Sequence, residues 1–117
     1  MTPAARSVYV FGFYLLFVGT ILTIFPNTLL SIVGIPETTE VWIHILGVVA
    51  FVLGLYYVFM APTDHFLFFV LSVYARITVF IWFVIFIIID LAPIELLPFG
   101  VIDLAGAIWT YTALRKK

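Results

Sequence analysis

Two charged residues lie inside long apolar runs of this 117-residue chain. Arg76 falls about ten residues into one run, which at 1.5 Å per helical residue is a depth of ~15 Å. Asp103 falls about eleven residues before the end of the next run, at ~16 Å. A lone charge at this depth of a bilayer costs about 2.5–3.5 kcal/mol on insertion scales. Arg76 and Asp103 are therefore predicted to face each other as a pair.

Three further residues are candidates for the same polar centre. At 100° per residue, Ser72 and Asp90 share one helical stripe with Arg76, and Tyr57 can reach it from the preceding apolar run. Two interpretations stay open. The first is a site, in which Arg76 holds an anionic or carbonyl-bearing ligand or Asp103 takes part in a proton-coupled step. The second is a structural pair that fixes the register of the helices and binds nothing.

The composition places these residues in lipid. Hydrophobic residues make up 66% of the chain and charged residues 9%, whereas soluble domains are about half apolar and a quarter charged. The absence of cysteine excludes disulfides and thiolate centres. A net charge of −1 gives no basic patch for nucleic acid. No motif for phosphate binding, acyl transfer or zinc is present, so no catalytic residue, metal or cofactor is assigned.

The apolar runs predict an all-α polytopic membrane protein, a single domain over residues 1–117 built as a four-transmembrane-helix bundle. At about 20 residues per span, the expected spans are 8–25, 41–60, 65–91 and 99–114. A short amphipathic helix over 28–33, capped by Asn27 and stopped by Gly34 and Pro36, is expected in the membrane interface between spans one and two. Thr63 or Asp64 is the expected cap of the third span.

Charge placement predicts the orientation. Four of the five basic residues flank the two ends of the chain (Arg6, Arg115, Lys116 and Lys117), and the connections after spans one and three carry acidic residues only. The positive-inside rule then places both termini in the cytoplasm, which requires an even number of spans. The expected location is the inner (plasma) membrane, crossed several times.

This layout resembles the DoxX-like group of small bacterial four-helix inner-membrane proteins. The features that carry the resemblance are Arg6 before the first run, Gly34-Ile35-Pro36 after the short helix, Tyr56-Tyr57 near the end of the second run, Arg76 in the third, and Gly100-Val101-Ile102-Asp103 at the start of the fourth. The name-giving proteins are associated with a thiosulfate:quinone oxidoreductase as a membrane subunit. No residue of this chain supports assigning that activity to it.

Three functions follow as hypotheses. The first is a non-enzymatic membrane subunit, or a binder of a lipophilic ligand such as a lipid or quinone, with Arg76 and Asp103 at its centre. The second is a small dimeric proton-coupled transporter that uses Asp103. It is similar in length to small multidrug-resistance exporters but lacks their acidic residue in the first span. The third is a membrane enzyme using Asp103, Tyr57 and Arg76. Expected partners are membrane lipid, a second copy of the chain or another membrane subunit.

Overall fold

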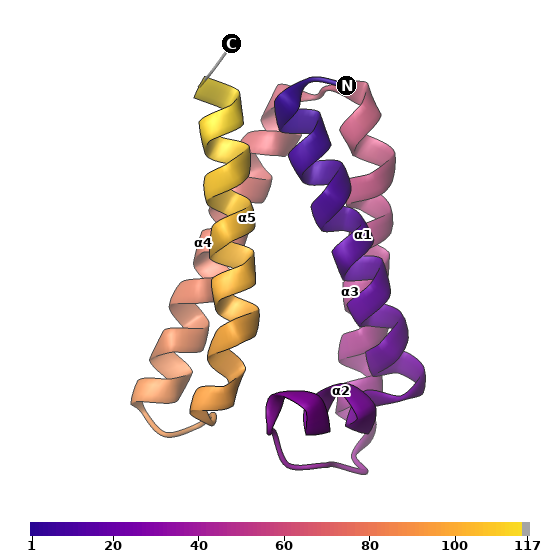
Figure 1. Ribbon diagram of the computed structural model, residues 1–117, viewed down its shortest axis with the longest axis vertical. Coiled ribbons are helices and arrows are strands. Elements are labelled where there is room, and N and C mark those ends of the chain that lie inside the picture. The colour runs from indigo at the N-terminus through magenta and orange to yellow at the C-terminus, as the bar shows by residue number, and fades with distance from the viewer. Residues whose placement is uncertain (116–117) are drawn as a thin grey trace.

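The computed structural model describes residues 1–115, and over that range the protein is all-α (Figure 1). Its elements are α1 (Pro3–Ile24), α2 (Pro26–Val33), α3 (Val41–Met60), the 3₁₀ helix η1 (Ala61–Thr63), α4 (Phe66–Ile88), the 3₁₀ helix η2 (Ile94–Leu96) and α5 (Leu97–Arg115). Four helices are long and apolar enough to cross a membrane. The prediction of a four-helix bundle with a short additional helix is confirmed.

The first helix begins earlier than expected. Thr2 caps α1 by accepting a hydrogen bond from Ala5 N (3.1 Å), and Pro3 stands at the first helical position, where its missing N–H costs nothing. The helix therefore includes Ser7, which the predicted span 8–25 left out. The last helix also starts earlier, at Leu97 instead of 99.

Asn27 does not cap the short helix, contrary to the prediction. Phe25 occupies the cap position without a side-chain hydrogen bond, and Pro26 follows it. The Asn27 amide instead makes two hydrogen bonds with the backbone of Thr38. It donates to the Thr38 carbonyl (3.0 Å) and accepts from the Thr38 N–H (2.9 Å). Asn27 thus fastens the α2–α3 loop. Gly34 ends α2 in the left-handed conformation (φ 83°), as expected.

The cap of α4 also differs from the prediction. His65 Nδ1 accepts from Phe68 N (3.3 Å), so His65 takes the position expected for Thr63 or Asp64. Asp64 instead accepts a hydrogen bond from the Thr2 hydroxyl (2.8 Å). This bond ties the start of α1 to the turn between α3 and α4.

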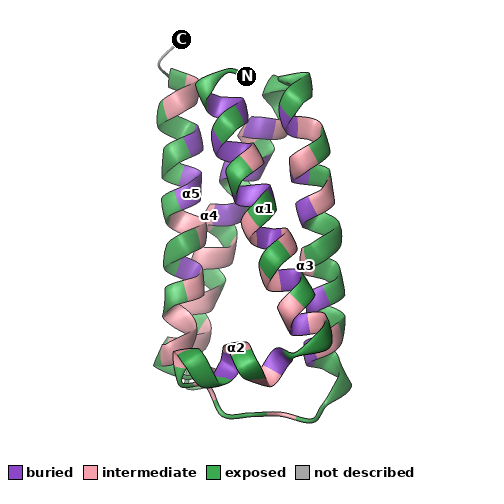
Figure 2. Cartoon of the chain, turned by 45° about the vertical axis from the view of Figure 1, so that its right-hand side comes forward, coloured by how far each residue is buried: buried purple, intermediate pink, exposed green. Residues whose placement is uncertain are grey.

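The helices pair as two antiparallel hairpins, α1 with α3 and α4 with α5, and α2 lies across the end opposite the termini (Figures 1 and 2). The α1–α3 pair is in backbone contact. A Cβ added to Gly19 would lie 2.5 Å from Phe51 N, and one added to Gly47 would lie 2.5 Å from Thr23 N. Small residues allow such close approach between membrane helices, where burial of apolar surface gives no driving force.

The two hairpins meet mainly at one end of the bundle. We call the half that contains the start of α1, η1 and the end of α5 the terminal half, and the half next to α2 the α2 half. All buried residues of α4 lie in the terminal half: Phe69, Ser72, Val73 and Arg76. Contacts between hairpins run mainly from α1 to α5. The chain therefore builds its polar centre where the hairpins join.

Candidate functional site

Arg76 lies midway along α4 with only 3% of its surface exposed. Its side chain turns back along its own helix, as the direction of the Cα–Cβ bond favours. Nε donates to the carbonyl of Ser72 (3.1 Å), and Nη2 donates to the Ser72 hydroxyl (3.0 Å). The guanidinium is thus held against the preceding turn of α4, and it points toward the terminal end of the bundle.

A chain of hydroxyl groups extends from the guanidinium into two other helices. Nη2 donates to Thr110 Oγ1 on α5 (2.8 Å), and this oxygen lies 2.7 Å from Ser7 Oγ on α1. The Ser7 hydroxyl donates to the carbonyl of Ala4 (2.7 Å). Because a hydroxyl has one proton, Thr110 must donate to Ser7. The bonds run in one direction through α4, α5 and α1, an arrangement in which each bond strengthens the next.

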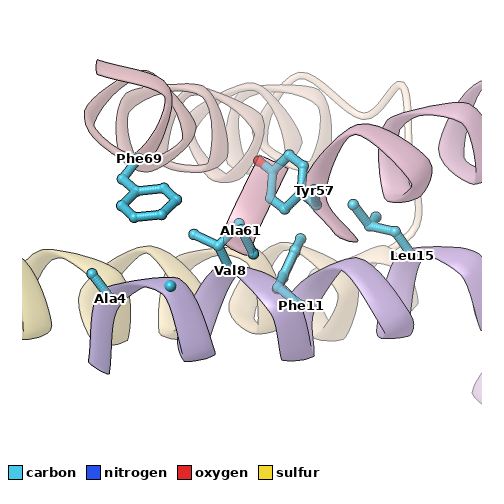
Figure 3. Close-up of a cluster of buried hydrophobic side chains, with 8 residues drawn as sticks. Ala4, Val8, Phe11, Leu15, Tyr57, Ala61 and Phe69 are labelled. Carbon is cyan, nitrogen blue, oxygen red and sulfur yellow. The ribbon is translucent and has the colours of Figure 1, made fainter. Parts of the chain in front are cut away.

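Two aromatic rings flank the guanidinium. Its Cζ lies 4.8 Å from the centroid of the Phe11 ring and 5.6 Å from that of Tyr57. Figure 3 shows both rings in the buried apolar cluster between α1 and α3, together with Phe69 from α4. A cation over an aromatic face gains about 2 kcal/mol when both are desolvated. The positive charge of Arg76 is thus stabilised by rings and hydroxyl groups.

One nitrogen of the guanidinium has no hydrogen-bond partner among residues 1–115. This nitrogen, Nη1, is buried. It lies beside Gly106 of α5, where an added Cβ would be 3.0 Å from it. Arginine offers five N–H donors, two of them on Nη1. Leaving a buried donor unbonded costs about 1–3 kcal/mol, and more for a charged group. An oxygen acceptor at this position would remove that cost.

The predicted direct pair between Arg76 and Asp103 is not formed. Asp103 lies within range of an electrostatic interaction with Arg76 but makes no ion pair or hydrogen bond with it. The reason is the direction of the arginine side chain. It leans toward the start of α4, so the antiparallel α5 presents Thr110 to it, seven residues and about 10 Å further along than Asp103.

The other predicted site residues divide into two groups. Ser72 and Tyr57 lie in the polar centre with Arg76, and Tyr57 is 3% exposed. Asp103 is half-buried at its edge. Asp90 lies outside it, because α4 ends at Ile88 and Asp90 follows in an exposed left-handed turn (φ 69°).

Three participants were not predicted as site residues: Ser7, Phe11 and Thr110. Thr110 shares a helical stripe with Asp103, so the depth and direction of Thr110 could be inferred from the sequence. A buried arginine needs oxygen acceptors, and hydroxyl residues at equal depth on neighbouring helices are the signal that identifies them. Ser7 meets this condition once α1 begins at Pro3.

Comparison with known proteins adds no further assignment. No family model, curated protein or solved structure matches the chain. Within residues 1–115 no three histidine or acidic side chains come together in a way that could hold a metal ion.

Proposed function

We propose that this chain is an integral membrane protein that binds a lipophilic ligand through an oxygen acceptor at Arg76. The single observation that carries the proposal is the buried Nη1, which has two N–H groups and no acceptor among the residues that the structure describes. Three of the five guanidinium donors are used to hold the side chain in place. The remaining two are already oriented, so a ligand that reaches them loses little affinity to reorganisation of the site.

The charges around the site favour a neutral ligand. Asp103 lies within electrostatic range of Arg76 and of Tyr14 on α1. In its ionised form the Asp103 carboxylate would offset the charge of the guanidinium and repel an anion. A carbonyl or hydroxyl oxygen accepts from Nη1 without adding charge. The rings of Phe11 and Tyr14, 5.3 Å apart, supply flat apolar surface nearby. A quinone or the carbonyl of a neutral lipid has this chemistry.

The proposal includes a topology and a cellular role. The start of α1 and the end of α5 lie at the same end of the bundle (Figure 1), and the basic residues beside them favour the cytoplasmic side of an inner membrane. The role would be that of a non-enzymatic membrane subunit or a binder of a lipophilic ligand, with Arg76 as its polar anchor. A second copy or another membrane subunit is the expected partner.

A proton-coupled transporter is the second candidate, because of the state of Asp103. This carboxylate lies within a span, half-buried, and makes no hydrogen bond or ion pair among the described residues. Such a group can take up and release a proton as its surroundings change. Proton-dependent substrate uptake into liposomes that disappears in Asp103→Asn would favour the transporter. Uptake that is absent in both proteins would leave ligand binding as the function.

The binding proposal is tested by native mass spectrometry of the protein in lipid nanodiscs loaded with a short-chain alkyl benzoquinone. The wild-type protein should retain the quinone. Arg76→Lys keeps the charge and a donor for Ser72 and Thr110 but removes Nη1, so retention should fall by about tenfold, equivalent to ~1.4 kcal/mol. Arg6→Gln, which changes an exposed arginine on α1, is the matched control.

Two results would overturn the proposal. One is equal retention of quinone by wild type and Arg76→Lys, because Nη1 would then have no part in binding. The other is no retention by a folded wild-type protein of either the quinone or a neutral diacylglycerol supplied in its place. Thermal unfolding of each variant establishes that it is folded before retention is compared.

A further inference from the structure

The outer face of the α4–α5 hairpin has a groove in the terminal half, separate from Arg76. Its volume is about 410 Å³. It runs from Phe66 to Ile77 along α4, which is about 16 Å at 1.5 Å per residue. Val73 and Ala107, both buried, contribute small side chains to it. Ala107 extends no further than its methyl group, and this leaves the space between the two helices unfilled.

The chemistry of the groove changes along its length. Its lining is aliphatic or aromatic except at the end of α5, where Arg115 contributes a guanidinium. Arg115 is exposed, and its Cζ lies 5.8 Å from the centroid of the Tyr111 ring. None of the described residues that line the groove is acidic. The sequence continues from Arg115 with two lysines, so the charge at this end of the chain is positive.

The dimensions and charge fit one component of the surrounding membrane. Half of a hydrocarbon core of ~30 Å is about 15 Å, the depth that the acyl chains of one leaflet occupy. A groove of about 16 Å therefore accommodates an acyl chain along its length. Arg115 belongs to the last turn of a membrane-spanning helix, where a phosphate group of the same leaflet lies within reach. Guanidinium groups bind phosphate with paired hydrogen bonds.

We infer that this groove binds an anionic phospholipid, with one acyl chain between α4 and α5 and the phosphate paired with Arg115. Basic residues at a membrane surface attract anionic lipids by about 1 kcal/mol per charge. The anionic lipid is favoured over a zwitterionic one because the described residues of the groove offer positive charge and no carboxylate to balance an ammonium group. This site is separate from that of Arg76, which is not among the residues that line the groove.

The test is native mass spectrometry of the full chain from nanodiscs of equal parts phosphatidylglycerol and phosphatidylcholine. The wild-type protein should retain phosphatidylglycerol in preference. Arg115→Gln should lose that preference by about fivefold, roughly 1 kcal/mol, and Arg115→Lys should recover part of it. Val70→Trp fills the groove and should reduce retention of both lipids. Val48→Trp, on the outward face of α3, is the control for an added tryptophan.

Three outcomes would overturn the inference. They are equal retention of the two lipids by wild type, an unchanged preference in Arg115→Gln, and equal loss in Val70→Trp and Val48→Trp. Arg115 and Val70 are exposed and half-buried respectively, so unfolding is not expected, and circular dichroism checks it. When the same nanodiscs are loaded with the short-chain benzoquinone, its retention should stay unchanged in Arg115→Gln, which separates this site from the one at Arg76.

Discussion

The terminal half and the α2 half of the bundle are held together by different interactions. In the terminal half all four long helices contribute buried side chains, and the hydrogen bonds of Arg76 join α4 to α5 and, through Thr110 and Ser7, to α1. In the α2 half the buried apolar cluster of Leu22, Leu30 and Ile43 belongs to α1, α2 and α3 only. No residue of α4 beyond Arg76 is buried.

The difference shows which interactions organise helices in lipid. Apolar side chains gain nothing by leaving lipid for protein, so packing of small residues and hydrogen bonds decide which helices associate. Backbone contact at glycines holds α1 to α3 along both halves, while the polar network holds the second hairpin at the terminal half. A ligand bound between the hairpins would act on the second, weaker association.

The largest effect is expected where the glycine contact is broken in the α2 half. A Cβ at Gly47 would lie 2.5 Å from Thr23 N and 2.7 Å from Leu22 C, both backbone atoms that no side-chain rotation can move. Gly47→Val should destabilise the fold by about 3 kcal/mol or more. Thermal unfolding in detergent measures it, with Val48→Leu, on the outward face beside it, as the control. A variant as stable as wild type would refute the close α1–α3 contact.

A smaller effect is expected where the polar network is broken in the terminal half. Thr110→Val keeps the shape of the side chain but removes the acceptor of Nη2 and the donor to Ser7. The expected destabilisation is about 1–2 kcal/mol, the range that model peptides give for hydrogen bonds between membrane helices. Thr112, which is exposed and bonds only to the Trp109 carbonyl among the described residues, provides the matched control Thr112→Val.

The same variant should change the arrangement of the hairpins. Because the chain has no cysteine, pairs of spin labels can be placed without altering native thiols, for instance at the outward-facing Tyr56 of α3 and Leu67 of α4. In Thr110→Val the distance distribution between these labels should broaden, while a pair within the α1–α3 hairpin should not change. Equal broadening of both pairs would show that the network does not act between hairpins specifically.

The smallest effect is expected at Asp90, outside the polar centre. Its positive φ of 69° is unfavourable for most side chains and favourable for glycine. Asp90→Gly should therefore raise stability by about 0.5 kcal/mol and leave quinone retention unchanged. Loss of quinone retention in this variant would show that Asp90 belongs to the site. It would contradict the placement of Asp90 outside the polar centre, after the end of α4.

The sequence was sufficient to predict the helices and the depth of Arg76, since both depend on the lengths of the apolar runs and on helical geometry. It was insufficient for the partners of Arg76, which depend on how α5 is aligned against α4 and on the direction of one side chain. The pair was predicted because Arg76 and Asp103 lie at equal depth along straight helices. The side chain of Arg76, however, reaches back toward the start of α4, to the level of Thr110. Asp90 was included because the third span was expected to continue past Ile88. Ser7 was missed because the first span was expected to begin one residue after it.

The proposed role of Arg76, donation from its two unpaired N–H groups to the ligand, can be tested on the arginine side chains themselves. The chain has three arginines, Arg6, Arg76 and Arg115, so the side-chain signals of ¹⁵N-labelled arginine can be assigned by substituting each in turn. Titration with the short-chain benzoquinone should shift the Nη signals of Arg76 saturably and leave those of Arg6 and Arg115 unchanged. Saturating quinone that leaves the Arg76 signals unmoved would contradict that role.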